Sequence, residues 1–209
     1  MSADYQDYGW QDKPAYSTGY IYPVIRHMLR YDKSKRILDM GCGNGEMTQR
    51  LIAEGFDVVG IDASQTGIDI AKRKHPDRFF LHDVSADKLP HEVGDRPFDI
   101  VISTEVIEHL YAPRAYMALI RKTLQSRRGD VILSTPYHGY LKNVALAVSG
   151  KMDTHYSPLW DGGHIKFWSR KTLTALLEEF GFEVTDFQGA GRLPYLWKSM
   201  ILRAKLSRA

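Results

Sequence analysis

The sequence predicts an α/β fold built on a doubly wound parallel sheet, and three observations support this. The stretch 37–45, I-L-D-M-G-C-G-N-G, has the pattern of a buried strand that leads into a glycine-rich turn, and a helical pattern follows at once. Four further strand patterns occur before residue 135 and alternate with helical patterns or turns. Asp62 and Asp83 directly follow two of these strands. Such alternation is typical of a parallel sheet with helices on both faces.

Each expected element depends on a local pattern. The run 98–103 is apolar except for Asp99, which predicts a central strand covered on both faces. Ser64 has the side chain of a helix N-cap, and Pro113 suits the first turn of a helix. In order, we expect helices over 17–30, 46–54, 64–74, 113–124 and 172–180, strands over 57–61, 78–82, 98–103, 131–134 and 183–187, and an irregular segment over 87–97.

The tail, 196–206, permits two interpretations. Its basic and aromatic residues would suit a helix that lies on a membrane surface, so peripheral membrane contact is one alternative. Its apolar residues, however, occupy alternate positions with Lys198 as the exception, and this is the pattern of a strand. We favour the strand.

The composition is that of one globular domain spanning residues 1–209, with 44% hydrophobic and 25% charged residues. The net charge is +3 with both signs mixed along the chain, too small an excess to indicate nucleic acid as an obligate partner. The single cysteine, Cys42, excludes an internal disulfide and suits a reducing compartment. No signal-peptide pattern or run of membrane-spanning length occurs, so we expect a cytoplasmic protein. The oligomeric state is left open.

The segment 135–168 is long for a connection in a compact domain, where such loops usually carry function or a helix of their own. An apolar stretch over 141–148 predicts a helix there. We expect this inserted segment to cover the site and to supply an aromatic, mostly apolar pocket for a substrate. It also contains His138, His155 and His164.

The glycine-rich turn is the first candidate binding feature. Glycine permits a positive φ and lets a ligand approach the backbone, and the helix that follows offers N–H groups at its start. The turn alone would also fit a dinucleotide site or a tightly packed loop. Asp62 can accept hydrogen bonds from both hydroxyls of a ribose, and Asp83 can reach a base. An acid at the end of a third strand is not part of the usual dinucleotide fingerprint.

The runs D-M-G-C-G-N-G at 39–45 and T-E-V-I-E-H-L at 104–110, with Asp62 and Asp83, resemble S-adenosylmethionine-dependent methyltransferases with a Rossmann-like fold. Within them, the chain is most similar to the ubiquinone-biosynthesis O-methyltransferase group, over residues 34–191. The resemblance implies a seven-stranded, mostly parallel sheet with helices on both faces and an antiparallel last strand. It also implies that residues 1–33 form an N-terminal lid over the cofactor, with Tyr16 and Tyr20 as candidates.

The resemblance further implies a role for each residue that would bind S-adenosylmethionine. Asp39 would orient the methionine amino group, Asp62 would hold the ribose, and Asp83 would accept from the adenine amino group. The glycines would let the methionine portion lie against the backbone, and the residues leaving the fourth strand would offer carbonyls. The cofactor-binding candidates are Asp39, Gly41, Gly43, Asp62, Asp83, Val84, Ser103 and Thr104.

Glu105, Glu108 and His109 form the candidate catalytic cluster. On a helical turn these positions share one face, and at the end of the fourth strand they would point into the ligand crevice. Two carboxylates with one imidazole suit Mg²⁺ or Mn²⁺, with His164 as a candidate fourth ligand and His138 as the second choice. In the resembled O-methyltransferases and in small-RNA 2′-O-methyltransferases, the matching residues are associated with a divalent ion.

Three interpretations of this cluster stay open. In the first, a divalent ion held by the cluster would bind a hydroxyl of the substrate and lower the pKa of that hydroxyl. Alternatively, His109 would act without a metal as the general base. In the third interpretation, Glu108 and His109 only cap and brace the helix. The small-RNA enzymes also carry a second histidine where this chain has Leu110, which weakens an RNA assignment.

The sequence therefore predicts a methyltransferase that moves the methyl group of S-adenosylmethionine to an oxygen of a small, hydroxylated acceptor of aromatic or lipid-like character. Glu108 and His109 are the expected catalytic residues. The alternatives are methylation of a nitrogen or a carboxyl group with His109 as base, and a binding module that holds the cofactor without catalysis. A nicotinamide-dependent dehydrogenase is a further alternative.

Overall fold

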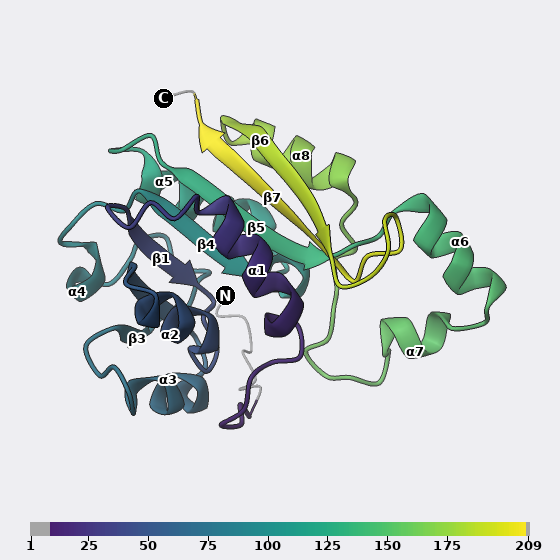
Figure 1. Ribbon diagram of the computed structural model, residues 1–209, viewed down its shortest axis with the longest axis horizontal. Helices are drawn as coiled ribbons and strands as arrows, with labels where there is room; N and C mark the ends of the chain where they lie inside the picture. The colour runs from purple at the N-terminus through teal and green to yellow at the C-terminus, as the bar shows by residue number, and fades with distance from the viewer. Residues whose placement is uncertain (1–8, 208–209) are drawn as a thin grey trace.

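A seven-stranded sheet in the order β3-β2-β1-β4-β5-β7-β6 forms the centre of the molecule (Figure 1). In this computed structural model, which describes residues 9–207, β7 is antiparallel to both neighbours and the other pairs are parallel. The fold predicted from the sequence is confirmed. The strands are β1 Arg36–Met40, β2 Asp57–Asp62, β3 Phe79–Leu81, β4 Ile100–Thr104, β5 Asp130–Pro136, β6 Phe182–Ala190 and β7 Ser199–Leu206.

The tail is therefore a strand, and the membrane-surface helix considered for it is wrong. Its apolar residues alternate along β7 and pack between β5 and β6. No helix in the range 9–207 is long and apolar enough to cross a bilayer.

The helices follow the predicted order, with short additions. The irregular segment expected over 87–97 contains one helical turn, and the inserted segment contains a second short helix besides the expected one. The helices are α1 Thr18–Met28, α2 Glu46–Ala53, α3 Gln65–Lys72, α4 His91–Gly94, α5 Pro113–Leu124, α6 Tyr140–Val148, α7 Met152–Tyr156 and α8 Arg170–Glu179, with a 3₁₀ turn, η1, over Ile107–His109.

The two faces of the sheet have separate cores because successive strand residues point to opposite faces. On one face, Ile100 and Ile102 pack with the buried residues of α1 and α2. On the other, Val101 packs with those of α5 and α8. The continuous apolar run in β4 is thus explained by burial on both sides.

The strand order reverses between β1 and β4, and ligands of open α/β sheets bind outside the carboxyl ends of the strands at such a point. Tyr116 of α5 joins these two strand ends. Its hydroxyl donates to the Met40 carbonyl oxygen at 3.2 Å and pairs with Ser103 Oγ at 2.7 Å. The side chain is buried, so these contacts fix the carboxyl ends of β1 and β4 relative to each other.

Segments outside the sheet surround this edge. The helices α6 and α7 of the insert lie beyond the carboxyl end of β5, and the β6–β7 loop lies beside α6 (Figure 1). The chain before α1 also reaches the edge, because Asn44 Nδ2 donates to the carbonyl oxygens of Gln11 and Lys13 at 3.0 and 2.8 Å. Residues 1–8 of the expected lid lie outside the described range.

We expect Tyr116→Phe to lower the free energy of unfolding by about 1–2 kcal/mol, because it removes a buried hydroxyl that joins β1 to β4. Urea denaturation measures the change. Tyr111→Phe is the matched control, since Tyr111 is 83% exposed. An equal loss in both variants would contradict the structural role of Tyr116.

Candidate active site

The glycine-rich turn after β1 forms one wall of the site. Gly41 and Gly43 have φ values of 85° and 54°, the left-handed region that favours glycine. A Cβ at Gly41 would lie 2.4 Å from Val106 Cγ2, and one at Gly43 would lie 2.4 Å from Trp10 Cζ2. Backbone conformation and lack of space therefore both require glycine at these positions.

Trp10 is a site residue that the sequence analysis did not single out. Its indole packs against Gly43 and Gly67, and its buried Nε1 has no hydrogen-bond partner in the described part of the chain. Asn44 donates hydrogen bonds to the carbonyl oxygens of Gln11 and Lys13. These contacts and the packing of Trp10 hold the segment 9–14 over the glycine turn. The available sequence signal was that aromatic residues are scattered through the polar stretch before α1.

Asp39 lies at the base of the turn and is fully buried. Thr48 Oγ1 donates to its Oδ2 at 2.5 Å, whereas Oδ1 has no hydrogen-bond partner among the described residues. Burial raises the pKa of this carboxyl from 3.8 to about 7, against the lowering effect of Thr48. An unsatisfied buried acceptor is costly, and a ligand ammonium group would satisfy it.

Asp62 ends β2 with its carboxylate held in place by the backbone. Gly43 N donates to one oxygen at 2.7 Å and Ser64 N to the other at 2.8 Å. Each carboxylate oxygen can accept a further hydrogen bond, so the group can still receive the two hydroxyls of a ribose. Ser64 also caps α3 as predicted, by accepting from Gly67 N at 3.0 Å.

The other cofactor-binding candidates lie along the same edge. Asp83 is exposed after β3, where its Oδ1 accepts from Ser85 N at 2.8 Å, and Val84 beside it is buried. Ser103 is buried at the end of β4 and pairs with Tyr116, and Thr104 follows it half-buried. These residues line the ends of β3 and β4 on either side of Asp39 and Asp62 in the sheet order.

Glu105 differs from the prediction. It precedes η1 with a left-handed φ of 56°, so Glu105, Glu108 and His109 do not share one helical face. Its carboxylate accepts from Ser134 Oγ at 2.8 Å and from Ser199 Oγ at 3.0 Å, which directs it toward β5 and β7. Its role as a metal ligand stays a prediction.

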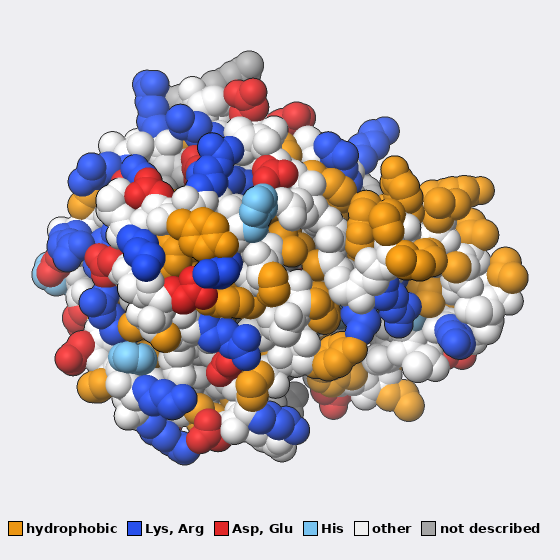
Figure 2. All heavy atoms as spheres, viewed as in Figure 1, with side chains coloured by type: hydrophobic (Ala, Val, Ile, Leu, Met, Phe, Trp, Pro, Cys, Tyr) orange, Lys and Arg blue, Asp and Glu red, His pale blue; other side chains and the backbone are white. Residues whose placement is uncertain are grey.

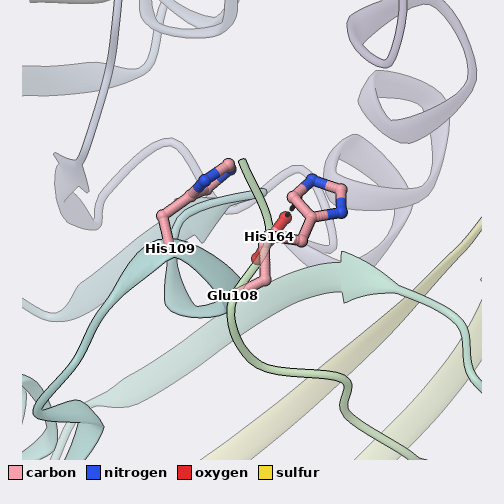
Figure 3. Close-up of side chains that lie close together, drawn as sticks. All are labelled: Glu108, His109 and His164. Atoms are coloured by element: carbon pink, nitrogen blue, oxygen red, sulfur yellow. Dashed lines mark ion pairs between the residues drawn. The ribbon is translucent and has the colours of Figure 1, made fainter. Parts of the chain in front are cut away.

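Glu108, His109 and His164 form the cluster in the structure (Figure 3). One candidate ligand atom from each lies within 4.8 Å of the other two. Glu108 is fully buried; Thr135 Oγ1 donates to its Oε2 at 3.0 Å, and Oε1 has no hydrogen-bond partner within residues 9–207. That oxygen lies 4.0 Å from His164 Nε2, along the dashed line in Figure 3.

The backbone brings His164 to this place. The N–H groups of Ile165 and Lys166 both donate to the Glu108 carbonyl oxygen at 2.9 Å, so the end of the insert is fixed to η1. Burial raises the pKa of Glu108 well above its usual range, and Glu105 adds to this. Burial also lowers the pKa of His164 to about 4. Both shifts favour neutral groups, so Glu108 and His164 do not form a charged pair near neutral pH.

The hydrogen bonds of His109 define its tautomer. Its Nδ1 lies 2.9 Å from the Gly162 carbonyl oxygen and 3.3 Å from that of Gly163. A carbonyl oxygen only accepts, so Nδ1 carries the proton and Nε2 keeps its lone pair. Burial lowers the pKa of His109, which favours this neutral form. A neutral imidazole that is protonated on Nδ1 can bind a metal or take up a proton through Nε2.

Comparison with known proteins identifies the family. Residues 20–186 match the family model described as a methyltransferase domain. A ubiquinone biosynthesis O-methyltransferase of Ruegeria sp. (strain TM1040) is 31% identical over 177 residues, which is 82% of this chain and 70% of the relative. This chain belongs to the family of S-adenosylmethionine-dependent methyltransferases.

A second relative of this methyltransferase, the enzyme of the same name from Dinoroseobacter shibae, is 32% identical over 165 residues; the match covers 75% of this chain and 63% of the relative. The magnesium protoporphyrin IX methyltransferase of Synechocystis PCC 6803, solved with bound SAH, has a TM-score of 0.67 at 20% identity, covering 90% of this chain and 82% of that one. It confirms the fold alone.

The other two histidines of the insert, His138 and His155, lie near the cluster of this methyltransferase. His138, the second-choice ligand, is buried in an aromatic group with His155, Tyr156 and Phe167 and is not part of the group of three. Burial, followed by the charge of Lys142, lowers the pKa of His138 to about 4. Lys142 is a second residue that the sequence analysis missed.

We expect the unfolding free energy of the cofactor-free methyltransferase to fall as the pH rises from 3.8 toward about 7, in part because of Asp39. Across this window the folded protein retains the Asp39 proton that the unfolded chain has released, so the folded state binds more protons. Asp39→Asn should reduce the slope by at most about 1.4 kcal/mol per pH unit.

Urea denaturation at a series of pH values measures these slopes. Asp87→Asn is the control, because Asp87 is exposed. If Asp39→Asn and the parent had equal slopes, Asp39 would not be a protonated buried acid in the folded protein.

Proposed function

We propose that this methyltransferase transfers the methyl group of S-adenosylmethionine to a hydroxyl oxygen of a small acceptor, with a divalent metal ion bound by Glu108, His109 and His164. The observation that carries the proposal is the buried Glu108 oxygen that has no hydrogen-bond partner among the described residues and lies 4.0 Å from an imidazole nitrogen. A bound cation would stabilise the ionised form of this buried carboxyl group.

The three residues fit a divalent ion. Neighbouring ligands of a six-coordinate Mg²⁺ or Mn²⁺ ion lie about 3 Å apart and opposite ligands about 4.2 Å apart. The candidate ligand atoms lie within 4.8 Å of one another, so they would move about 1 Å closer together when an ion binds. Because two of the three are imidazoles, the site favours Mn²⁺ over Mg²⁺.

The surrounding residues would prepare this site for the ion. Thr135 and the backbone of residues 165 and 166 hold Glu108, and the carbonyls of the 162–163 turn hold His109 with Nε2 as the acceptor. When bound, the ion would lower the pKa of an acceptor hydroxyl. Transfer also needs the acceptor oxygen in line with the methyl group, so the remaining role of the protein is positioning.

The tautomer of His109 also supports a second candidate function. A neutral His109 that keeps the Nε2 lone pair can act as general base without a metal, for a hydroxyl, nitrogen or carboxyl acceptor. The two candidates differ in whether Glu108 and His164 are needed to bind an ion.

For the methyl donor, we propose Asp39, Gly41, Gly43, Asp62, Asp83, Val84, Ser103 and Thr104 as the binding residues. Asp39 Oδ1 would accept from the methionine ammonium group, and the fixed carboxylate of Asp62 would receive the ribose hydroxyls. Trp10 and the segment 9–14 would act as part of the lid, because they already cover the glycine turn.

The insert supports an acceptor with apolar character. Figure 2 shows hydrophobic side chains gathered at the end of the molecule that carries α6 and α7. An exposed apolar surface next to a polar cluster is typical of a site for a partly apolar ligand. The largest exposed apolar residues of the insert are Tyr140, Leu141, Val144, Val148, Met152, Leu159, Trp160, Ile165 and Phe167.

We expect Mn²⁺ to bind saturably to protein loaded with S-adenosylhomocysteine, and Mg²⁺ to bind more weakly. Glu108→Gln and His164→Ala should each remove binding, because each removes one of three ligands. Calorimetric titration measures this. His91→Ala is the control, since its side chain is 93% exposed.

No binding of either ion to the parent, or unchanged binding in Glu108→Gln, would contradict the metal site. The metal-free mechanism would then be tested by His109→Ala.

We expect Asp62→Ala to weaken binding of S-adenosylhomocysteine at least about tenfold, which corresponds to about 1.4 kcal/mol. Asp83→Ala should weaken it less, because Asp83 is exposed and would contact only the base. Calorimetric titration compares both with Asp77→Ala, an exposed acid after α3. Parent-like affinity of Asp62→Ala would exclude Asp62 as the ribose-binding residue.

A further inference from the structure

The helix α6 buries a lysine and exposes its apolar residues. Along Tyr140–Val148, Lys142 is the buried residue, with 6% of its surface exposed. Tyr140, Leu141 and Val148 on the same helix are 80%, 54% and 85% exposed. A surface helix normally has the opposite arrangement, because burial of a lysine costs free energy and burial of apolar residues gains it. The inverted arrangement of α6 indicates that the buried position of Lys142 has a function.

The fold does not neutralise this cation. The Lys142 ammonium group donates to the Lys198 carbonyl oxygen at 3.3 Å, and an ammonium group has three donors. No carboxylate within the described residues lies close enough for an ion pair with it. Burial lowers the pKa of Lys142 to about 8, with Arg192 adding to the effect and Glu105 opposing it. Near neutral pH the group is therefore still mostly charged.

Arg192 is a second cation whose charge reaches Lys142 from a different segment. It lies in the loop between β6 and β7, beside α6, and its charge acts on Lys142, His155 and Tyr16. The charge of Lys142 in turn acts on His164. The two cations are thus within electrostatic range of each other, and Lys142 is within range of the proposed metal cluster. Two like charges close together, with no carboxylate of the described residues in an ion pair with Lys142, are typical of a site for an anion.

We propose that Lys142 and Arg192 bind a carboxylate group of the methyl acceptor, so that the acceptor is a hydroxylated acid. The proposal rests on the proposed function, because it places the acceptor beside the cluster of Glu108, His109 and His164. The carboxylate would occupy the unfilled hydrogen-bonding positions of Lys142, and the apolar remainder would contact the aromatic residues of the insert. The insert would then determine which acceptors bind.

A purely structural lysine is the competing explanation. In that case Lys142 only joins α6 to the backbone before β7 and offsets the charge of Glu105. A structural role would affect stability, whereas an acceptor-binding role would affect the preference for an anion over a neutral molecule of the same shape. The test therefore measures this preference.

Binding of 4-hydroxybenzoate and of 4-hydroxybenzamide, its uncharged counterpart, would be compared by calorimetric titration with and without S-adenosylhomocysteine. We expect the parent to prefer the acid by at least about tenfold. Lys142→Met should remove the preference, and Lys142→Arg should retain most of it. Lys151→Met is the matched control, because Lys151 is an exposed lysine just after α6.

Equal affinity of the parent for both probes, no binding of the acid, or a preference that survives Lys142→Met would overturn the proposal. If circular dichroism shows that Lys142→Met does not fold, Arg192→Met is tested in its place. Arg192 is exposed, and its loss should also reduce the preference for the acid. Failure of the parent to bind S-adenosylhomocysteine would instead count against the proposed function. The probe titrations without that ligand test the anion site separately.

Discussion

Burial of acidic groups at one edge of the sheet is the constraint on which the rest of the site depends. Asp39 near the end of β1 and Glu108 after β4 are fully buried, and in the part of the chain that the structure describes each has one carboxyl oxygen without a hydrogen-bond partner. Such groups destabilise a folded chain unless a ligand satisfies them. Both groups lie where the strand order reverses, and Tyr116 holds the two strand ends there. This position suits the binding of cationic groups of a ligand.

The two unsatisfied oxygens suit different cations. Asp39 lies at the base of the glycine turn, and its free oxygen would suit the ammonium group of the methyl donor. Glu108 faces two imidazoles instead, and this donor set suits a metal ion more than an ammonium group. Under the proposed function, the methyl donor and the acceptor hydroxyl would therefore occupy separate positions on the same edge of the sheet.

The sheet and the glycine turn could be predicted from sequence because their signals are local. Apolar runs, helix caps such as Ser64, and glycines report conformation within a few residues. The pairing of Glu108 with His164 was anticipated from residue type, but its geometry arises from hydrogen bonds across 57 positions, between the Glu108 carbonyl and residue 165. The left-handed φ of Glu105 was not foreseen, because its cause is a tertiary one: Ser134 and Ser199 hold the side chain.

Lys142 shows most clearly where sequence patterns fail. Periodicity assumes that the apolar face of a helix is the buried one, and in α6 that assumption inverts the true orientation. The available sequence signal was a single charged residue in a mostly apolar helix. Its interpretation required the structure, which brings the loop that carries Arg192 beside α6. The insert and the β6–β7 loop lie beyond the carboxyl end of β5, next to the proposed metal cluster. The chemistry of the acceptor is therefore inferred from these segments, and Lys142, a buried cation without an ion-pair partner among the described residues, is their most informative feature.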